Sequence, residues 1–191
     1  MPAHRPYLRS HLVQAWRATL NVEYCGQLIN SERGLQGYFC QHLMQLLNQE
    51  QELRQRRIFI EPRLSTPDAQ GRKYPDILIC DAEKIIGIVE FKYKPKMRPD
   101  YAKDLDTLKF ADEHHRSLYV SNDRFLGISF DDKRYALAQN AVLCSAGVYA
   151  GRRLELVEKL PSQMKRRFLQ LDAITKNNQN PRLLCNDKEI P

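Results

Sequence analysis

The 191-residue sequence has no apolar run long enough to enter a membrane. Nothing near its N-terminus has the apolar core of a signal peptide, and no stretch approaches the ~20 apolar residues of a spanning helix. We therefore expect no membrane partner and, by default, a cytoplasmic location. The five cysteines are odd in number, widely spaced and without a CxxC pair, so they predict reduced thiols rather than a disulfide framework or a zinc cluster.

Two nucleotide-related motifs are also missing. The sequence has no glycine-rich phosphate loop and no His-Asn-His arrangement, which disfavours a P-loop NTPase and an HNH nuclease. Hydrophobic residues make up 42% of the chain and charged residues 28%, which is ordinary globular composition. The length then predicts a single domain over residues 1–191.

Positive charge is present in excess. The formal net charge is +7, and the surplus of Lys and Arg is concentrated in two stretches, 91–103 and 152–167. Such clusters suit a polyanion, because each neutralised phosphate releases counterions. A soluble protein with a basic surface explains the charge equally well.

Apolar spacing predicts several helices. Residues recur at steps of three and four over 8–20, 31–48 and 100–114, with Ser31 as the N-cap of the second helix. Residues 161–173 have the pattern of a basic amphipathic helix. We expect the tail over 176–191 to be irregular.

Short β-branched runs predict the strands. In the first two thirds of the chain they cover 57–61, 74–80, 85–93 and 118–120, with a loop over 62–73. Two apolar stretches, 125–130 and 134–150, match neither period cleanly, and we interpret them as further strands. Ile85 to Val89 leaves no polar face, which indicates a central strand covered on both sides.

Three charged residues lie at the ends of the most apolar strands. Glu90 and Lys92 are two apart, so both side chains leave the same face of their strand, while Phe91 points to the other. Asp76 belongs to the preceding strand. Burying such charges without partners is costly, and a divalent cation is one partner that would satisfy them. The alternative is a hairpin whose charged ends reach solvent.

The hairpin register decides whether Asp76 joins this face. If Asp76 lies opposite Glu90, then Asp81 lies opposite Ile85 and the loop has three residues, 82–84. A two-residue loop would place Asp76 opposite Val89, on the wrong face, unless a β-bulge corrects the pairing. We therefore predict a three-residue loop or a bulge.

These residues resemble a known signature. Pro75-Asp76, thirteen intervening residues and then Glu90-Phe91-Lys92 resemble the motif of the PD-(D/E)xK phosphodiesterase superfamily. The order of elements over about 31–121 is also similar to that superfamily's core. The resemblance implies an α/β, restriction-endonuclease-like αβββαβ core with a central mixed sheet flanked by helices. The helix over 8–20 and the residues over 122–175 would be additions to it.

The resemblance also implies roles for single residues. Asp76, Glu90 and the backbone carbonyl of Phe91 would bind Mg²⁺, or Mn²⁺ as its substitute, through oxygen ligands. Lys92 would orient or help deprotonate the attacking water and offset charge on the phosphorane. Glu32 matches an acidic residue that many members carry on the helix before the sheet, although the helix dipole also favours an acidic residue there.

The implied activity is that of a metal-dependent nuclease, with DNA favoured over RNA. Basic residues after the triplet are candidates for phosphate contacts: Lys94, Lys96, Arg98 and Lys103. For Lys103, an exposed lysine is the favoured explanation. An alternative function is a nucleic-acid-binding or assembly module that keeps the fold without turnover. A homodimer and an activating partner protein also remain open.

Overall fold

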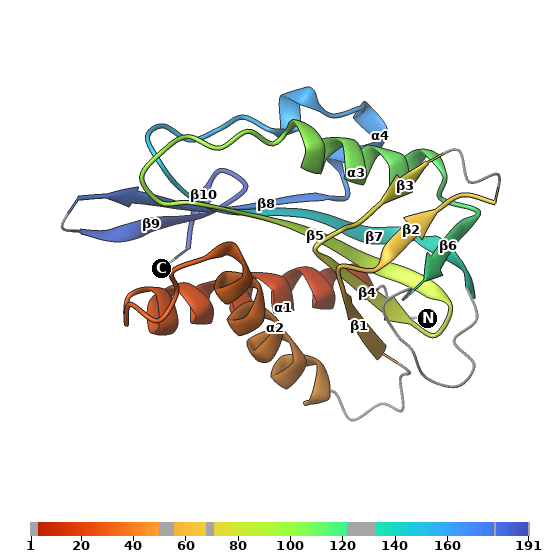
Figure 1. Cartoon of the computed structure of the whole chain (residues 1–191), viewed down its shortest axis with the longest axis horizontal. Coiled ribbons are helices and arrows are strands. Elements are labelled where there is room, and N and C mark those ends of the chain that lie inside the picture. The colour runs from red at the N-terminus through yellow and green to blue at the C-terminus, as the bar shows by residue number, and fades with distance from the viewer. Residues whose placement is uncertain (1–3, 50–55, 68–70, 122–132, 178, 191) are drawn as a thin grey trace.

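The computed structural model describes residues 4–49, 56–67, 71–121, 133–177 and 179–190, over which helices flank a mixed β-sheet in an α/β arrangement (Figure 1). The helices are α1 (His4–Thr19), η1 (Leu20–Tyr24), α2 (Glu32–Asn48), α3 (Ala102–Glu113), η2 (Val157–Lys159) and α4 (Ser162–Lys165). The strands are β1 (Arg56–Ile60), β2 (Arg63–Ser65), β3 (Arg72–Lys73), β4 (Ile77–Asp81), β5 (Lys84–Lys94), β6 (Leu118–Ser121), β7 (Lys133–Ala150), β8 (Phe168–Lys176), β9 (Gln179–Cys185) and β10 (Lys188–Glu189).

The three longer helices agree with the predictions from apolar spacing. The N-cap is also confirmed, because the Ser31 side chain accepts a hydrogen bond from the Gly34 N–H at 3.1 Å. Helices α1 and α2 bury residues such as Trp16 and Phe39 in one hydrophobic core, whereas α3 buries Leu105 and its neighbours in a second. The two cores lie on opposite faces of the sheet, so the prediction of a doubly covered central strand is confirmed.

The β4–β5 hairpin contains the predicted bulge. Near the turn, Cys80 pairs with Ile85 and Asp81 with Lys84, which leaves the two-residue loop 82–83. Further along, Ile79 pairs with Gly87 and Ile77 with Val89. Ile86 therefore has no partner across the hairpin, and this extra residue restores the parity that brings Asp76 to the face of Glu90.

On the side away from β4, β5 pairs with β7. It runs parallel to β5 over most of its length, with Val89 opposite Cys144 and Lys92 opposite Gly147, and β8 follows in parallel on its other side. The predicted strand at 118–120 forms as β6, but it pairs with β2 and with the first residues of β7 rather than with β5. Residues 134–150 thus supply a central strand, whereas the predicted strand over 125–130 lies outside the described residues.

Three sequence predictions are wrong. Within the loop predicted over 62–73, two short strands form, β2 and β3. The helix predicted over 161–173 is only the four-residue α4, and β8 then begins at Phe168. Residues 168–173 are all buried in a strand that pairs with both β7 and β9, and this pairing overrides the helical pattern of the charges. The tail predicted to be irregular forms β9 and β10 as far as Glu189.

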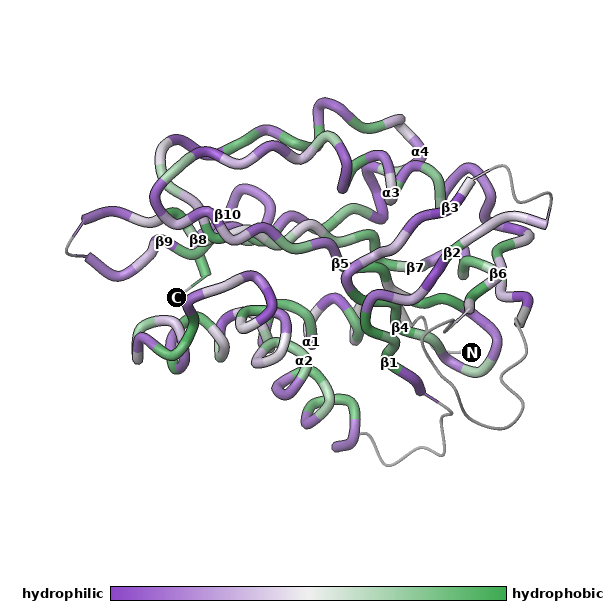
Figure 2. The backbone as a smooth tube through the Cα atoms, viewed as in Figure 1, coloured by the Kyte–Doolittle hydropathy of each residue, from purple (hydrophilic) through white to green (hydrophobic). Residues whose placement is uncertain are grey.

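In the view of Figure 1, α1 and α2 lie below the central sheet, and α3 and α4 lie above it. Figure 2 shows hydrophobic residues concentrated along β4, β5 and β7, between these helices. Among the described residues, no helix is long and apolar enough to cross a membrane.

Candidate active site

The predicted site residues lie together where β5 continues beyond the end of its pairing with β4. Pairing between the two strands ends at Ile77 and Val89, so the next N–H groups on that edge of β5 need other acceptors. Phe91 N–H donates to Asp76 Oδ2 at 2.6 Å, and Tyr93 N–H donates to Glu32 Oε2 at 3.0 Å. Two carboxylates, one from the hairpin and one from α2, are therefore held against one edge of β5.

Glu90 is buried beside them, with only 4% of its surface exposed. Burial raises the pKa of Glu90 well above its usual value, and the charges of Asp76 and Asp104 raise it further, against the smaller effects of Lys92 and a backbone hydrogen bond at Asp76. Its Oε1 atom has no hydrogen-bond partner among the described residues. A buried carboxylate that lacks a donor is costly unless it is protonated or meets a cation.

Asp76 is less deeply buried than Glu90, but its pKa is raised by the same kinds of cause. Burial raises its pKa to about 6, the hydrogen bond from Phe91 opposes that rise, and the charges of Glu32 and Asp104 add to it. At neutral pH this carboxyl is therefore mostly ionised, as a metal ligand has to be.

Lys92 is paired with a residue that the sequence analysis did not single out. Its Nζ donates to Asp104 Oδ1 at 2.9 Å, and Asp104, on α3, is 3% exposed. Burial lowers the pKa of Lys92, but the hydrogen bond and charge of Asp104, with the charges of Glu32 and Asp76, raise it overall. Lys92 is thus a cation at neutral pH. The second oxygen of Asp104, Oδ2, is buried and has no hydrogen-bond partner within the described part of the chain.

Helix α2 supplies two polar groups to the same place. Glu32 is its first residue, directly after the Ser31 cap, and Gln36 follows one turn later. Gln36 Nε2 donates to the Asp76 backbone carbonyl at 2.7 Å, which fixes the segment that carries the Asp76 side chain. The helix thereby positions Asp76 through its backbone and β5 through Glu32.

Within the described part of the chain, no three His, Cys, Asp or Glu side chains form a group that could hold a metal ion. A cation here would therefore take two carboxylates, Asp76 and Glu90, and complete its shell with other oxygens. Mg²⁺ is commonly bound in this way, because it retains several waters and needs only one or two carboxylates. The Phe91 carbonyl is a suitable further ligand, since the N–H and C=O of one strand residue face the same neighbour and its N–H faces Asp76.

The predicted phosphate contacts lie close to this site in the chain and are accessible. Lys94, Lys96, Arg98 and Lys103 are all exposed. The loop that carries Lys96 and Arg98 is tied to the sheet, because Ala150 N–H donates to the Met97 carbonyl at 3.2 Å and Thr175 Oγ1 to the Pro95 carbonyl at 2.6 Å. These cations are therefore displayed at the end of the sheet where β5, β7 and β8 finish.

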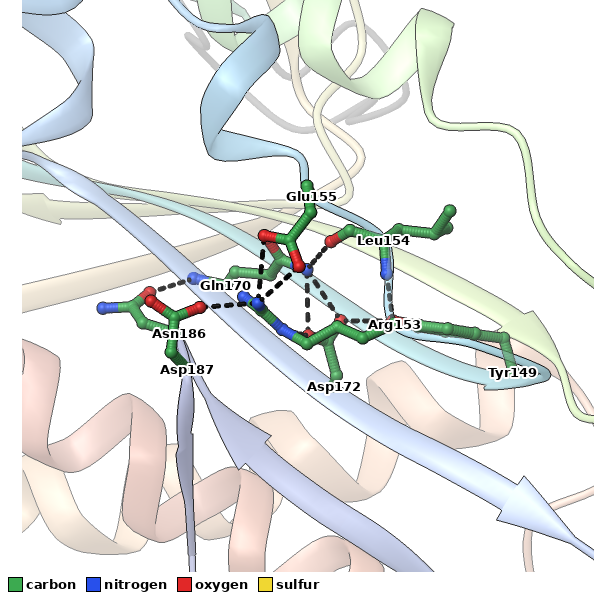
Figure 3. Close-up of polar contacts among 8 residues, drawn as sticks. All are labelled: Tyr149, Arg153, Leu154, Glu155, Gln170, Asp172, Asn186 and Asp187. Carbon is green, nitrogen blue, oxygen red and sulfur yellow. Dashed lines mark hydrogen bonds and ion pairs between the residues drawn. The ribbon is translucent and has the colours of Figure 1, made fainter.

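A second buried carboxylate lies on the same face of the sheet, at Asp172 of β8 (Figure 3). It accepts hydrogen bonds from Tyr149 Oη at 3.0 Å, Arg153 Nε at 3.2 Å and Gln170 Nε2 at 2.9 Å. Both of its oxygens are occupied, Oδ1 by Tyr149 and Oδ2 by Arg153 and Gln170. These contacts tie the segment after β7 to β8.

Register relates the two carboxylate clusters. Lys92, Gly147 and Asp172 are direct neighbours across β5, β7 and β8, and so are Glu90, Ser145 and Gln170. Gly147 leaves room for the buried ring of Tyr101, because a Cβ atom at Gly147 would overlap the Tyr101 hydroxyl. Tyr101 thus fills the space between the site at β5 and the contacts around Asp172.

Sequence reasoning missed Asp104, Gln36 and Asp172. For Asp104 a signal was present, since it precedes Leu108 by four residues and Ala111 by seven and so belongs to the apolar face of α3. Gln36 is likewise one turn after Glu32. Asp172 had no usable signal, because the helix predicted over 161–173 assigned its environment wrongly.

Comparison of the chain with protein-family models, with curated proteins and with solved structures found no match in any of the three. The site can therefore be interpreted only from its own residues and geometry.

Proposed function

We propose that this protein is a metal-dependent nuclease with a restriction-endonuclease-like core of the PD-(D/E)xK kind, acting on DNA in preference to RNA. The single observation that carries the proposal is the hairpin register. A bulge at Ile86 brings Asp76 to the face of Glu90, where the Phe91 N–H holds its carboxylate. Two acidic side chains and Lys92 converge at the same end of β5.

The donor set fits a hard divalent cation. Asp76, Glu90 and the Phe91 carbonyl would hold Mg²⁺, and the unpartnered Oε1 of Glu90 is the kind of atom that such an ion satisfies. When bound, Mg²⁺ supplies a Lewis acid for a phosphoryl oxygen and lowers the pKa of a coordinated water. Burial is the largest cause of the raised pKa values of Asp76 and Glu90, and the nearby charge of Lys92 opposes it only in part.

Lys92 acts in this proposal as a fixed positive charge. Its pairing with Asp104 keeps it protonated and limits its movement, so it can stabilise negative charge that develops on the phosphorane oxygens and orient the attacking water. A protonated Lys92 is unsuited to removing a proton from that water. Of the two roles expected for Lys92, the geometry therefore favours orientation and charge stabilisation.

Cleavage of a panel of nucleic acids tests the proposal. End-labelled single-stranded DNA, blunt duplex DNA, duplex with a single-stranded extension, and RNA are incubated with the protein in Mg²⁺, Mn²⁺ or EDTA. We expect cleavage of DNA that requires the metal and is lost in Asp76→Asn and in Lys92→Met. Glu83→Gln is the matched control, because Glu83 is an exposed acidic residue of the same hairpin.

Circular dichroism has to show that each variant is folded. Undiminished cleavage by the folded Asp76→Asn/Lys92→Met double variant would refute the assignment. Binding of DNA without cleavage under every metal condition would favour the alternative, a non-catalytic nucleic-acid-binding module. One observation is compatible with that alternative: Asp76 and Glu32 accept backbone N–H groups of β5 and so also have a structural role.

A further inference from the structure

An open pocket of about 420 Å³ lies at the end of β5, on the opposite face of the sheet from the side chains of Glu90 and Lys92. Its walls come from η1 and the turn after it, from the end of β5, and from the start of β9. The lining side chains are mainly aromatic and amide groups: Tyr24, Cys25, Gln27, Ile29, Tyr93, Gln179, Asn180 and Pro181. The pocket has no use in the cleavage chemistry described above.

Tyr93 belongs both to the pocket and to the acidic site. Its backbone N–H donates to Glu32, which lies beside Asp76, while its side chain lines the pocket. The hydroxyl group donates to the Ile29 carbonyl at 2.8 Å, and the ring packs edge to face against Tyr24 with centroids 6.3 Å apart. The aromatic wall is therefore fixed in place before any ligand arrives.

The amide wall faces solvent. Gln27, Gln179 and Asn180 are all exposed, so their donors and acceptors are accessible to a ligand. Aromatic rings with nearby amide groups match a nucleobase, because a base stacks on an aromatic ring and presents donors and acceptors along its edge. A paired base inside a duplex offers neither its faces nor its Watson–Crick edge.

Positive charge borders the pocket. Gln179 pairs with Lys176 across the β8–β9 turn, and Thr175, the preceding residue, holds the loop that carries Lys96 and Arg98. The exposed cations of that loop are thus next to the β8–β9 side of the pocket, at the same end of the sheet. A nucleic-acid strand following these cations would have its phosphates on the loop and a base within reach of the pocket.

We propose that this pocket binds one unpaired nucleobase of the substrate, beside the end of β5 that also carries the acidic site. The inference rests on the proposed function and narrows it. The preferred substrate is a single strand, or a duplex with an unpaired nucleotide at the cleavage position, and a fully paired blunt duplex is a poor ligand. Stacking on Tyr24 and Tyr93 is tolerant of sequence, whereas the amides add a modest preference among bases.

Cys25 provides a native probe of occupancy. It is exposed and lines the pocket, whereas Cys40, Cys80 and Cys144 are buried and Cys185 is partly buried. The rate at which N-ethylmaleimide alkylates Cys25 is measured by mass spectrometry, with Ca²⁺ replacing Mg²⁺, in the presence of single-stranded DNA, single-stranded RNA or blunt duplex. We expect single strands to slow alkylation several-fold and the blunt duplex to leave it unchanged.

Variants separate the pocket from general electrostatic binding. Tyr24→Leu should weaken binding of single-stranded DNA on the order of 10-fold, with duplex binding unchanged. Asn180→Ala, which changes an exposed side chain, should reduce single-strand affinity by a smaller factor and serves if Tyr24→Leu does not fold. Tyr7→Leu is the matched control, because Tyr7 is an exposed tyrosine near the other end of α1, roughly 25 Å away along the helix.

The outcomes distinguish this inference from the proposed function. Equal protection of Cys25 by single strand and blunt duplex, or wild-type single-strand binding by both pocket variants, would overturn the base pocket even if the protein cleaves DNA. Selective protection of Cys25 by single strands, in a protein that cuts none of the substrates, would support the pocket and leave cleavage as the part that failed.

Discussion

Two buried carboxylates on one face of the sheet have opposite surroundings. Asp172 on β8 accepts hydrogen bonds from Tyr149, Arg153 and Gln170, and both of its oxygens are occupied. Glu90 on β5 is buried to a similar extent, yet its Oε1 has no partner among the described residues. Its charged neighbours include two further carboxylates, Asp76 and Asp104.

The difference separates a structural charge from a functional one. Burial raises the pKa of Asp172 too, but the hydrogen bonds from Gln170 and Tyr149 and the charge of Arg153 all oppose the rise in part. Around Glu90 the strongest neighbours repel a negative charge. A bound cation would relieve this repulsion at Glu90. At Asp172, in contrast, both carboxylate oxygens already accept hydrogen bonds.

The largest expected effect is on catalysis. Glu90→Gln keeps the shape of the side chain and removes its charge, so it should lower kcat/KM for DNA cleavage on the order of 10²- to 10³-fold or more. Single-turnover cleavage in Mg²⁺ measures the loss. Wild-type rates in the folded variant would mean that Glu90 is not part of the reacting site.

Replacement of Asp172, whose two oxygens both accept hydrogen bonds, should lower the stability of the fold rather than the rate of cleavage. Asp172→Asn removes the charge that accepts hydrogen bonds from Arg153, Tyr149 and Gln170, so the free energy of unfolding should fall by about 2 kcal/mol, as measured by urea denaturation. Glu155→Gln is the control, because that exposed carboxylate also pairs with Arg153 and should cost less than about 1 kcal/mol. If Asp172→Asn left the free energy of unfolding unchanged, the distinction between the two carboxylate clusters would be wrong.

For Glu90, we expect the free energy of unfolding to change in the opposite direction. Because the folded-state pKa of Glu90 is raised, its contribution to stability is present below the unfolded-state pKa and is lost as the pH rises through the folded-state value. Without metal at pH 8, Glu90→Gln should therefore be more stable than the wild type, as measured by urea denaturation. Equal or lower stability would show that the ionised Glu90 has partners in the protein.

A smaller effect concerns the pH dependence of metal binding. Burial raises the pKa of Asp76 to about 6, and only the ionised carboxylate binds a cation. Mn²⁺ affinity should fall as the pH is lowered through about 6, roughly 10-fold for each further unit when a single proton competes. Titrations from pH 8 to pH 5 measure the slope, and an affinity independent of pH would exclude Asp76 as a ligand.

The local parts of this arrangement were predictable from the sequence. The β4–β5 hairpin, its parity requirement and the common face of Glu90 and Lys92 follow from the two-residue period of a strand. The pairing of β7 with β5 did not follow, because β7 is buried on both faces and such runs lack a periodic signal. Asp104 was missed because its role depends on how α3 packs against β5.

The central claim is that Asp76 and Glu90 form a divalent-cation site, and calorimetric titration with Mg²⁺ and Mn²⁺ tests it most directly. The account predicts saturable binding to the wild type, a higher Tm in the presence of the metal, and loss of both effects in Asp76→Asn and Glu90→Gln but not in Glu83→Gln. No binding to the wild type, or equal binding by the two site variants, would contradict it.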